Sequence, residues 1–320
     1  MYDIIIDSIF RQDVIQGLSA PEKYLLPKYF YDAKGDYLFG QIMHCPEYYL
    51  TRAETEILRD YSGAILQACW SSQNPLAIVE LGAGDATKTR YLLQEALRLQ
   101  YSKLYIPIDI SENIIDYLHT SLPAHLPGMQ IKGYCGEYLP MLAEVQANEP
   151  ARKLVLFLGS SIGNLLPQEA LTFCQHLYAY LNAGDFVLMG FDLKKNPQII
   201  LNAYNDKGGL TRAFNLNLLN RINQELGGNF QPDNFMHYPV YDPMTGACKS
   251  YLISTCAQQV TLDNGIYFDF AQDEPIYMEV SQKYSEAEIN QMGQRAGFKP
   301  VQTFLDSQRL FADVLWQKVE

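Results

Sequence analysis

Four short apolar segments alternate with amphipathic ones between residues 76 and 190, and this rhythm restricts the fold more than any other feature of the chain. Each apolar segment is continuous, whereas a strand with one face in water alternates apolar and polar residues. Strands that are apolar throughout belong to parallel sheets covered by helices on both faces. The sequence therefore predicts a doubly wound α/β fold, with strands at 76–81, 104–109, 154–158 and 185–190.

The rest of the chain extends this sheet and adds a second region. Helical spacing predicts helices at 86–99, 111–118, 168–181 and 285–296. Segments 299–304 and 310–316 are two further strands, which can close a seven-stranded sheet. Between 196 and 284 the rhythm breaks into a helical segment at 199–226 and β-like segments at 251–255 and 276–280. We expect this stretch to pack with the N-terminal arm as a second, smaller α+β domain.

Charge and composition narrow the classes of function. The formal net charge is -12, whereas a nucleic-acid binder needs a basic surface to neutralise phosphates. No run of about 18 apolar residues occurs, and the first four residues lack the basic and apolar regions of a signal peptide. We expect a cytoplasmic monomer with no nucleic-acid and no membrane partner.

The cysteines and histidines do not form a metal-binding pattern. The six cysteines are scattered, with no pair at CxxC spacing, and the five histidines are equally dispersed. We therefore expect reduced thiols, no disulfide framework and no metal site.

A capping signal precedes the first strand and a glycine-rich turn follows it. Thr51 and Glu54 have the spacing of a capping box at the start of a helix. Gly82 and Gly84 stand where the first strand meets the next helix, and neither has the Cβ atom that would obstruct a sharp turn or an approaching ligand. The turn alone is weak evidence, because phosphate-binding loops and dinucleotide-binding folds use the same device.

Two acidic residues favour S-adenosylmethionine (SAM) as the ligand of this turn. Glu80 precedes the glycines, where an acidic group faces a cationic cofactor, and no Lys-Ser or Lys-Thr follows as in a phosphate-binding loop. Asp109 ends the second strand, where a carboxylate accepts hydrogen bonds from both ribose hydroxyls. NAD needs the same carboxylate and stays an alternative, although Ala86 replaces the third glycine and Asp85 would repel a pyrophosphate.

Two later segments fall at the same edge of the predicted sheet. Residues 135–138, with Glu137 and Tyr138, resemble the adenine-proximal segment of class I methyltransferases, where an acidic side chain meets the exocyclic amine. Residues 158–164, with Gly159 and Asn164, follow the third strand at the carboxyl edge where ligands of this fold collect. A solvated loop and a simple tight turn are the alternatives.

In their order along the chain, these motifs resemble one family, the L-histidine Nα-methyltransferases of ergothioneine biosynthesis. The resemblance covers almost the whole chain. It is carried by residues 29–32, 38–39, 46–52, 80–84, 88–90, 107–109, 158–165, 192–193, 203–206, 214–217, 223–226 and 279–283. A chance match of so many ordered segments is improbable.

The resemblance implies a class I, Rossmann-like methyltransferase that uses SAM to trimethylate the α-amino group of L-histidine, giving hercynine. Its SAM-binding domain would comprise residues 52–194 plus 285–320, and its substrate-binding domain residues 1–51 plus 195–284. The residues near the cofactor would be Glu80, Gly82, Gly84, Lys88, Asp109, Glu137 and Tyr138. The amino acid would bind Tyr48, Gly159, Asn164 and Tyr204 through its amino and carboxylate groups, and Glu279 and Ser281 through its imidazole. Tyr31 would lie near the reacting amine, and with Asn164 it is a candidate catalytic residue.

The chemistry of these residue types agrees with the implied roles. Tyrosine hydroxyls, an asparagine and a backbone N–H supply donors and acceptors for the carboxylate and the amine of an amino acid. Glu279 and Ser281, two residues apart, would share one face of a strand and offer a partner to each imidazole nitrogen. Taken alone, the same spacing fits a strand whose polar face is in water.

One departure from the family leaves the substrate open. Ser250 stands where the family often has Met on the strand that covers the imidazole. The same chemistry on another aromatic amino acid or a small amine is therefore an alternative. A second alternative is a non-catalytic protein that binds SAM and an amino acid.

Overall fold

The computed structural model describes residues 2–72 and 75–319, and its contacts divide the chain into two units. Unit 1 takes Met1–Tyr49 and Lys195–Ser281, and unit 2 takes Leu50–Lys194 and Gln282–Glu320. The boundaries that we expected, at 51/52 and 284/285, lie two or three residues further along the chain. No helix among the described residues combines the length and the apolar character needed to cross a membrane.

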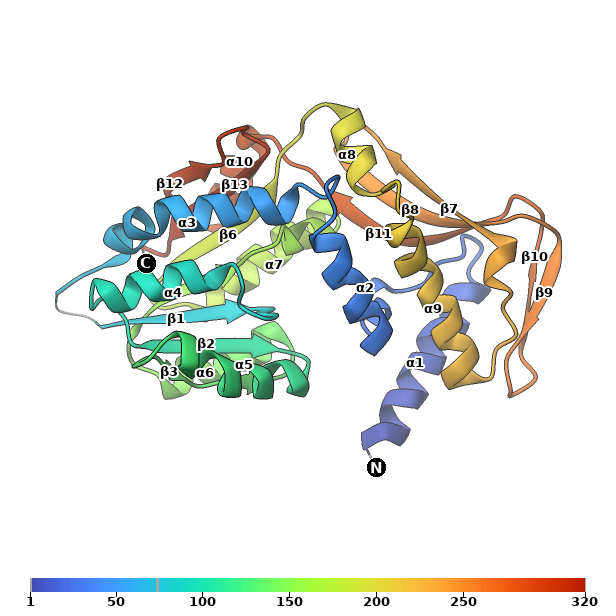
Figure 1. The fold of residues 1–320 in the computed structure, drawn as a ribbon, viewed down its shortest axis with the longest axis horizontal. Coiled ribbons are helices and arrows are strands. Elements are labelled where there is room, and N and C mark those ends of the chain that lie inside the picture. Colours follow the sequence, from blue (N-terminus) through green and yellow to red (C-terminus); the bar gives the residue numbers. More distant parts are fainter. Residues whose placement is uncertain (1, 73–74, 320) are drawn as a thin grey trace. The chain divides into compact units, whose positions relative to one another are not determined.

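Unit 2 is built on one mostly parallel sheet (Figure 1). Its eight strands are β1 (Leu76–Leu81), β2 (Leu104–Asp109), β3 (Gln130–Ile131), β4 (Tyr134–Cys135), β5 (Arg152–Phe157), β6 (Phe186–Asp192), β12 (Lys299–Leu305) and β13 (Phe311–Gln317). Their order is β12-β13-β6-β5-β1-β2-β3, and β4 also pairs with β2. The two short strands β3 and β4 thus share one edge position, so the eight strands fill the seven predicted positions.

The strand directions confirm a doubly wound fold closed by a C-terminal hairpin. β2, β1, β5 and β6 run parallel, and β13 is antiparallel to both β6 and β12. Four of these strands are almost wholly buried along their length, as continuous apolar segments require. The carboxyl ends of β1, β2 and β5 therefore meet along one edge of the sheet.

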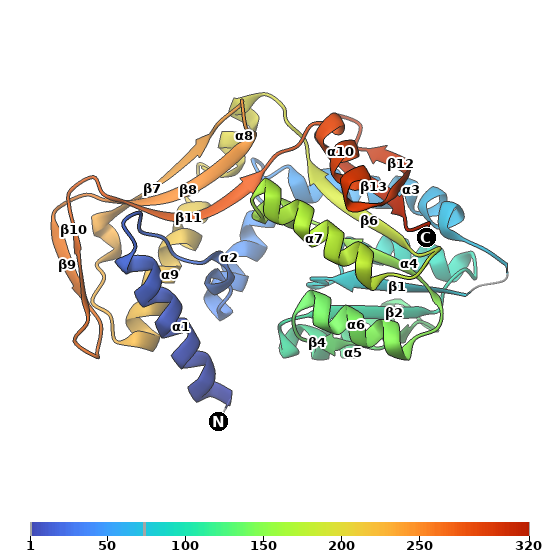
Figure 2. The same ribbon diagram turned by 180° about the vertical axis from the view of Figure 1, so that it is seen from behind.

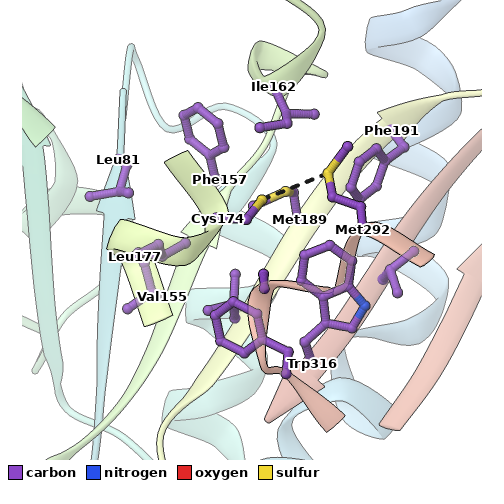
Figure 3. Close-up of a cluster of buried hydrophobic side chains, with 14 of the residues drawn as sticks. Leu81, Val155, Phe157, Ile162, Cys174, Leu177, Met189, Phe191, Met292 and Trp316 are labelled. Atoms are coloured by element: carbon purple, nitrogen blue, oxygen red, sulfur yellow. Dashed lines mark hydrogen bonds between the residues drawn. The ribbon is translucent and has the colours of Figure 1, made fainter. Parts of the chain in front are cut away.

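Helices cover both faces of the sheet (Figures 1 and 2). They are α3 (Leu50–Cys69), α4 (Thr89–Arg98), α5 (Glu112–His125), α6 (Tyr138–Asn148), α7 (Pro167–Tyr180) and α10 (Glu286–Ala296). Helices α6, α7 and α10 bury their apolar faces against one side of the sheet, and α3 and α4 lie on the other. In Figure 3, Trp316 and Phe191 of the sheet pack beside Met292 of α10 and Cys174 of α7, whose sulfur atoms are 3.7 Å apart.

Three predicted helix boundaries are wrong for local reasons. The capping box predicted at Thr51 does not form, because α3 begins at Leu50 and already includes Thr51. Helix α4 begins three residues later than predicted, since Ala86 adopts a positive φ of 54° within the glycine turn. Helix α5 runs on past Leu118 to His125 and includes Pro123.

Unit 1 combines helices with two small antiparallel sheets. Its helices are α1 (Tyr2–Ser19), η1 (Pro27–Phe30), α2 (Ala33–Met43), α8 (Pro197–Ala203), α9 (Leu210–Leu226) and η3 (Pro232–Asn234). Its strands are β7 (Phe235–Tyr241), β8 (Ala247–Ser254), β9 (Gln258–Thr261), β10 (Tyr267–Phe270) and β11 (Pro275–Gln282), ordered β11-β8-β7 and β10-β9. One apolar core joins helices α1, α2 and α9 to β7, β8 and β11.

The helix predicted over 199–226 is in fact two helices with a turn between them. Gly209 has a positive φ of 72° at the start of α9, which a continuous helix does not allow. The Asp206 carboxylate accepts hydrogen bonds from the N–H groups of Leu210 and Thr211, at 2.8 and 2.7 Å. These hydrogen bonds cap the N-terminus of α9, so α9 is a helix separate from α8.

Candidate active site

The glycine turn of unit 2 leaves room for a ligand beside one glycine. Gly82 has a φ of +75° and Gly84 a φ of +51°, both in the left-handed region. A Cβ on Gly82 would lie 2.8 Å from the Tyr138 hydroxyl, so the protein itself fills that side. A Cβ on Gly84 would meet no protein atom within 4 Å. The open space at Gly84 lets a ligand approach the backbone closely.

Glu80 fixes the strand that leads into this turn. Its carboxylate is buried and accepts hydrogen bonds of 2.5 Å from Thr89 on α4 and from Tyr105 on β2. Burial raises the pKa of Glu80 to about 7, although both hydrogen bonds lower it. The structure thus gives Glu80 a role in holding α4 to the sheet, beside the predicted role toward the cofactor.

Asp109 stands at the carboxyl end of β2, directly across from the glycine turn. Its two oxygens accept hydrogen bonds from the N–H of Gly84, at 3.3 Å, and of Ser111, at 3.0 Å. Each carboxylate oxygen has a second lone pair, so Asp109 can still accept hydrogen bonds from a diol.

The segment after β4 lies at the same edge. The N–H of Gly136 donates to the carbonyl of Asp109 at 2.9 Å, which places the following residues beside that carboxylate. Glu137 is exposed at the start of α6. Tyr138 packs edge-on against Phe157, and its burial, aided by the charge of Asp109, raises its pKa to about 12. The phenol therefore keeps its proton at neutral pH.

Lys88 belongs to an ion pair that the sequence did not reveal. Its ammonium pairs with one carboxylate oxygen of Glu54 on α3, and the other oxygen of Glu54 accepts the N–H of Gly159 at 2.6 Å. Glu54 is wholly buried, whereas the Lys88 side chain is 22% exposed. A charged residue on the apolar face of α3, in line with Ile57 and Leu58, was the available signal.

The loop after β5 is held in a strained backbone. Gly159 and Ser160 both have positive φ, of 73° and 58°. The hydroxyl of Ser160 accepts a hydrogen bond from the N–H of Asp192 at 3.1 Å, which stabilises the turn. Asn164 ends the short helix η2 (Ser161–Asn164) with its side chain exposed.

The residues at this edge fit a nucleoside cofactor that carries an amino-acid tail. They provide an open glycine backbone at Gly84, a carboxylate for a ribose at Asp109 and the ammonium of Lys88, whose side chain is partly exposed. A ribose diol, an adenine and a carboxylate require groups of these kinds.

In unit 1, the structure brings together a buried tyrosine and a serine. The hydroxyls of Tyr204 and Ser281 form a hydrogen bond of 2.7 Å, and both residues are buried. Glu279 lies two residues before Ser281 on β11 and is half-buried. Alternation along a strand places Glu279 and Ser281 on one side of β11.

Aromatic rings connect this pair to the two other predicted tyrosines. The rings of Tyr48 and Tyr204 are 6.3 Å apart, and Phe39 lies 6.4 Å from Tyr48 and 5.7 Å from Tyr31, all centre to centre and edge-on. Tyr31 is 46% exposed. Four predicted residues, Tyr31, Tyr48, Tyr204 and Ser281, thus belong to one continuous set of contacts within unit 1.

Ser250 is buried on β8, the central strand of the three-stranded sheet that includes β11. It lies opposite Pro239 of β7 in the antiparallel register. Its small side chain stands at the position where we noted a departure from the family.

The chain matches a known protein family along almost its whole length. A family model described as "Histidine-specific methyltransferase, SAM-dependent" matches residues 10–318. The histidine N-alpha-methyltransferase of Mycolicibacterium smegmatis is 36% identical over 299 residues, which cover 92% of this chain and 91% of that protein. Both units of the chain fall within these matches.

Two further similarities are weaker. Ergothioneine biosynthesis protein 1 of Schizosaccharomyces pombe is 30% identical over 284 residues, which are 86% of this chain and 36% of that longer protein. Among solved structures, the magnesium protoporphyrin IX methyltransferase of Synechocystis aligns over 91% of this chain and 95% of that one, with 14% identity and a TM-score of 0.45.

Proposed function

The chain belongs to the family of histidine-specific, SAM-dependent methyltransferases, and we propose that it trimethylates the α-amino group of L-histidine to give hercynine. The enzyme class and the cofactor follow from the family. The specific amino acid, the position of methylation and the number of methyl groups are parts of the proposal.

The observation that carries the proposal is the buried hydroxyl pair of Tyr204 and Ser281, with Glu279 on the same side of β11. A histidine side chain needs one partner for each imidazole nitrogen, and a carboxylate with a hydroxyl supplies them. In the relative from Mycolicibacterium smegmatis, histidine N-alpha-methylation is the named activity. We assign the imidazole to Glu279 and Ser281, and the amino and carboxylate groups to Tyr48, Tyr204, Gly159 and Asn164.

We assign the cofactor to the edge of the unit 2 sheet. Asp109 would accept the ribose hydroxyls, and Glu137 would accept the exocyclic amine of adenine, with Tyr138 beside it. Lys88 would bind the carboxylate of the amino-acid tail, and Gly82 and Gly84 would let the backbone come close. Bound SAM supplies a methyl group on a sulfonium, which a neutral amine attacks in line.

The protein's task is then to present a neutral amine. A free α-amino group is mostly protonated at neutral pH, so a proton must leave before each transfer. We assign this step to Tyr31, directly or through an ordered water, and the orientation of the amino acid to Asn164. Each added methyl group makes the positively charged amine larger. The rings of Tyr48 and Tyr204 would stabilise this cation through cation–π contacts.

The proposal also covers the setting in which the enzyme works. We propose that it acts in the cytoplasm as a monomer, on free amino acid. The formal charge of -12 disfavours a nucleic-acid partner, because phosphates would be repelled.

Incubation of the protein with SAM and each of the twenty amino acids, followed by mass spectrometry, tests the proposal. We expect a gain of up to three methyl groups on histidine alone. Methylation of another amino acid would move the substrate assignment and draw attention to Ser250. If none of the twenty amino acids gained a methyl group, that result would overturn the proposal. Asn164→Ala should reduce turnover at least tenfold, by the loss of about 1.4 kcal/mol of transition-state stabilisation, whereas Asn148→Ala, on the exposed end of α6, should not.

A further inference from the structure

Glu54 connects three separate parts of unit 2 through its two carboxylate oxygens. One oxygen accepts the N–H of Gly159, in the loop after β5, at 2.6 Å. The other pairs with the ammonium of Lys88, which lies just before α4. A Cβ built on Gly159 would be 3.6 Å from that ammonium, so the three groups are in mutual contact.

The sheet makes room for this carboxylate. Gly190 on β6 lies beneath Glu54, and a Cβ at this position would collide with a carboxylate oxygen of Glu54. The strand partner of Gly190 is Asp313 on β13. Asp313 is fully buried, and among the described residues neither of its oxygens has a hydrogen-bond partner. An ionised carboxylate without partners would be very unfavourable here.

Glu54 and Lys88 form the ion pair at the centre of this cluster. Burial raises the pKa of Asp313 well above its ordinary value, and the charge of Glu54 raises it further against the opposing effect of Lys88. Burial without hydrogen-bond partners therefore favours the neutral form of Asp313. Burial lowers the pKa of Lys88, but the attraction of Glu54 outweighs it and the net pKa is raised. Lys88 remains a cation, with Glu54 as its counter-ion.

We propose that Glu54 is a positioning residue that holds the Lys88 ammonium, together with the Gly159 loop, in place to bind the carboxylate of the cofactor's amino-acid tail. Lys88 is the charged member of the network whose side chain is partly exposed, and a lysine side chain without a fixed partner samples many rotamers. Glu54 removes that freedom before the ligand arrives. This inference rests on the cofactor assignment of the proposed function and does not depend on which amino acid is methylated.

The sharpest test compares two ligands that differ in the tail. S-adenosylhomocysteine carries the carboxylate, and 5′-methylthioadenosine keeps the adenosine but lacks the amino-acid tail. Calorimetric titration of both ligands would be made with the wild type, Glu54→Gln, Lys88→Met and the double variant. Glutamine fills the same volume, but it cannot accept the Gly159 N–H and pair with Lys88 at once. Glu56→Gln, on the same helix and also accepting a backbone N–H, is the matched control.

We expect Glu54→Gln to lower the affinity for S-adenosylhomocysteine about tenfold and to change the affinity for 5′-methylthioadenosine by no more than about twofold. The double variant should bind S-adenosylhomocysteine no more than about twofold worse than Lys88→Met alone, because Glu54 acts through Lys88. Equal losses for both ligands, unchanged affinity, or effects that multiply in the double variant would overturn the proposal. If Glu54→Gln does not fold, Glu54→Asp, which keeps the charge but shortens its reach, is measured against the same expectations.

Discussion

Tyr105 donates a hydrogen bond of 2.5 Å to the Glu80 carboxylate inside unit 2, so that a phenol of β2 and a carboxyl of β1 meet beneath helix α4. Thr89 of α4 donates to the other oxygen. The pKa of this carboxyl, about 7 because of its burial, lies well above its ordinary value of 4.5. The state of one proton at Glu80 is therefore coupled to folding.

The stability of the protein should depend on pH through Glu80. Because the folded state binds this proton more tightly than the unfolded chain, the contribution of Glu80 is complete below pH 4.5 and is lost as the pH rises through about 7. Glu80→Gln removes the titration. Between about pH 5 and pH 8, the wild type should lose about 2 kcal/mol of unfolding free energy relative to the variant. Urea unfolding at both pH values measures the difference, and a constant difference would contradict the assignment.

Gly84→Ala should lower the affinity for the cofactor, whereas its effect on the stability of the fold should be small. The new methyl group meets no protein atom, so the cost to the fold is the positive φ alone, about 1 kcal/mol. A cofactor lying against Gly84 would be pushed away. Gly128→Ala is the matched control, since Gly128 has a φ of +94° and the same open surroundings. We expect similar melting temperatures for the two variants and a loss of S-adenosylhomocysteine affinity, measured by titration, only for Gly84→Ala.

The hydroxyl pair of Tyr204 and Ser281 should affect the binding of the amino acid and not the binding of the cofactor. Tyr204→Phe and Ser281→Ala each remove the hydrogen bond between the two buried hydroxyls, and each should raise the KM for histidine about tenfold. The rise in KM in the double variant should be smaller than the product of the two single rises, because each single substitution already removes the same hydrogen bond. Tyr238→Phe, on the exposed side of β7, is the control. Steady-state kinetics that show a changed KM for SAM instead would refute the assignment.

The ion pair of Lys283 and Asp192 should be important for stability. Both side chains are fully buried, and their charged atoms are 2.7 Å apart. Lys283→Met leaves a buried carboxylate without its counter-ion and should cost about 3 kcal/mol of unfolding free energy. Adding Asp192→Leu should recover part of that loss, since an apolar pair of similar volume tolerates burial. Denaturant unfolding of the single and double variants decides whether the recovery occurs.

Much of the sheet could be predicted because its strands carry a simple signal. β1 and β2 have the predicted bounds, since every residue of β1 is buried and both strands are apolar except for Glu80 and Asp109 near their carboxyl ends. Helix starts were harder. Ala86, of the residue type with the highest helix propensity, adopts a positive φ because the turn from β1 requires it, and no local propensity predicts this.

Some of the site residues could likewise be predicted from the sequence, and others could not. Asp109 and the glycines lie at the end of a strand, and their position follows from the order of strands and helices. Glu54 escaped prediction because its partners, Lys88 and Gly159, are 34 and 105 residues away in the chain. Its spacing from Thr51 fitted a capping box, which the structure does not form. Tyr204 and Ser281, 77 residues apart, were named as site residues only through the resemblance to the family, and their hydrogen bond was not predicted.

The last strand of the chain is an interior strand, since β13 lies between β6 and β12. On the ribosome, β1, β2, β5 and β6 emerge well before Phe311–Gln317, and β6 waits as an open edge with unpaired N–H and C=O groups. Unit 1, in contrast, has all its residues once Ser281 has emerged. All residues of unit 1 therefore leave the ribosome before β13 does, and a translation product that stops short of β13 would leave the β6 edge open to aggregation.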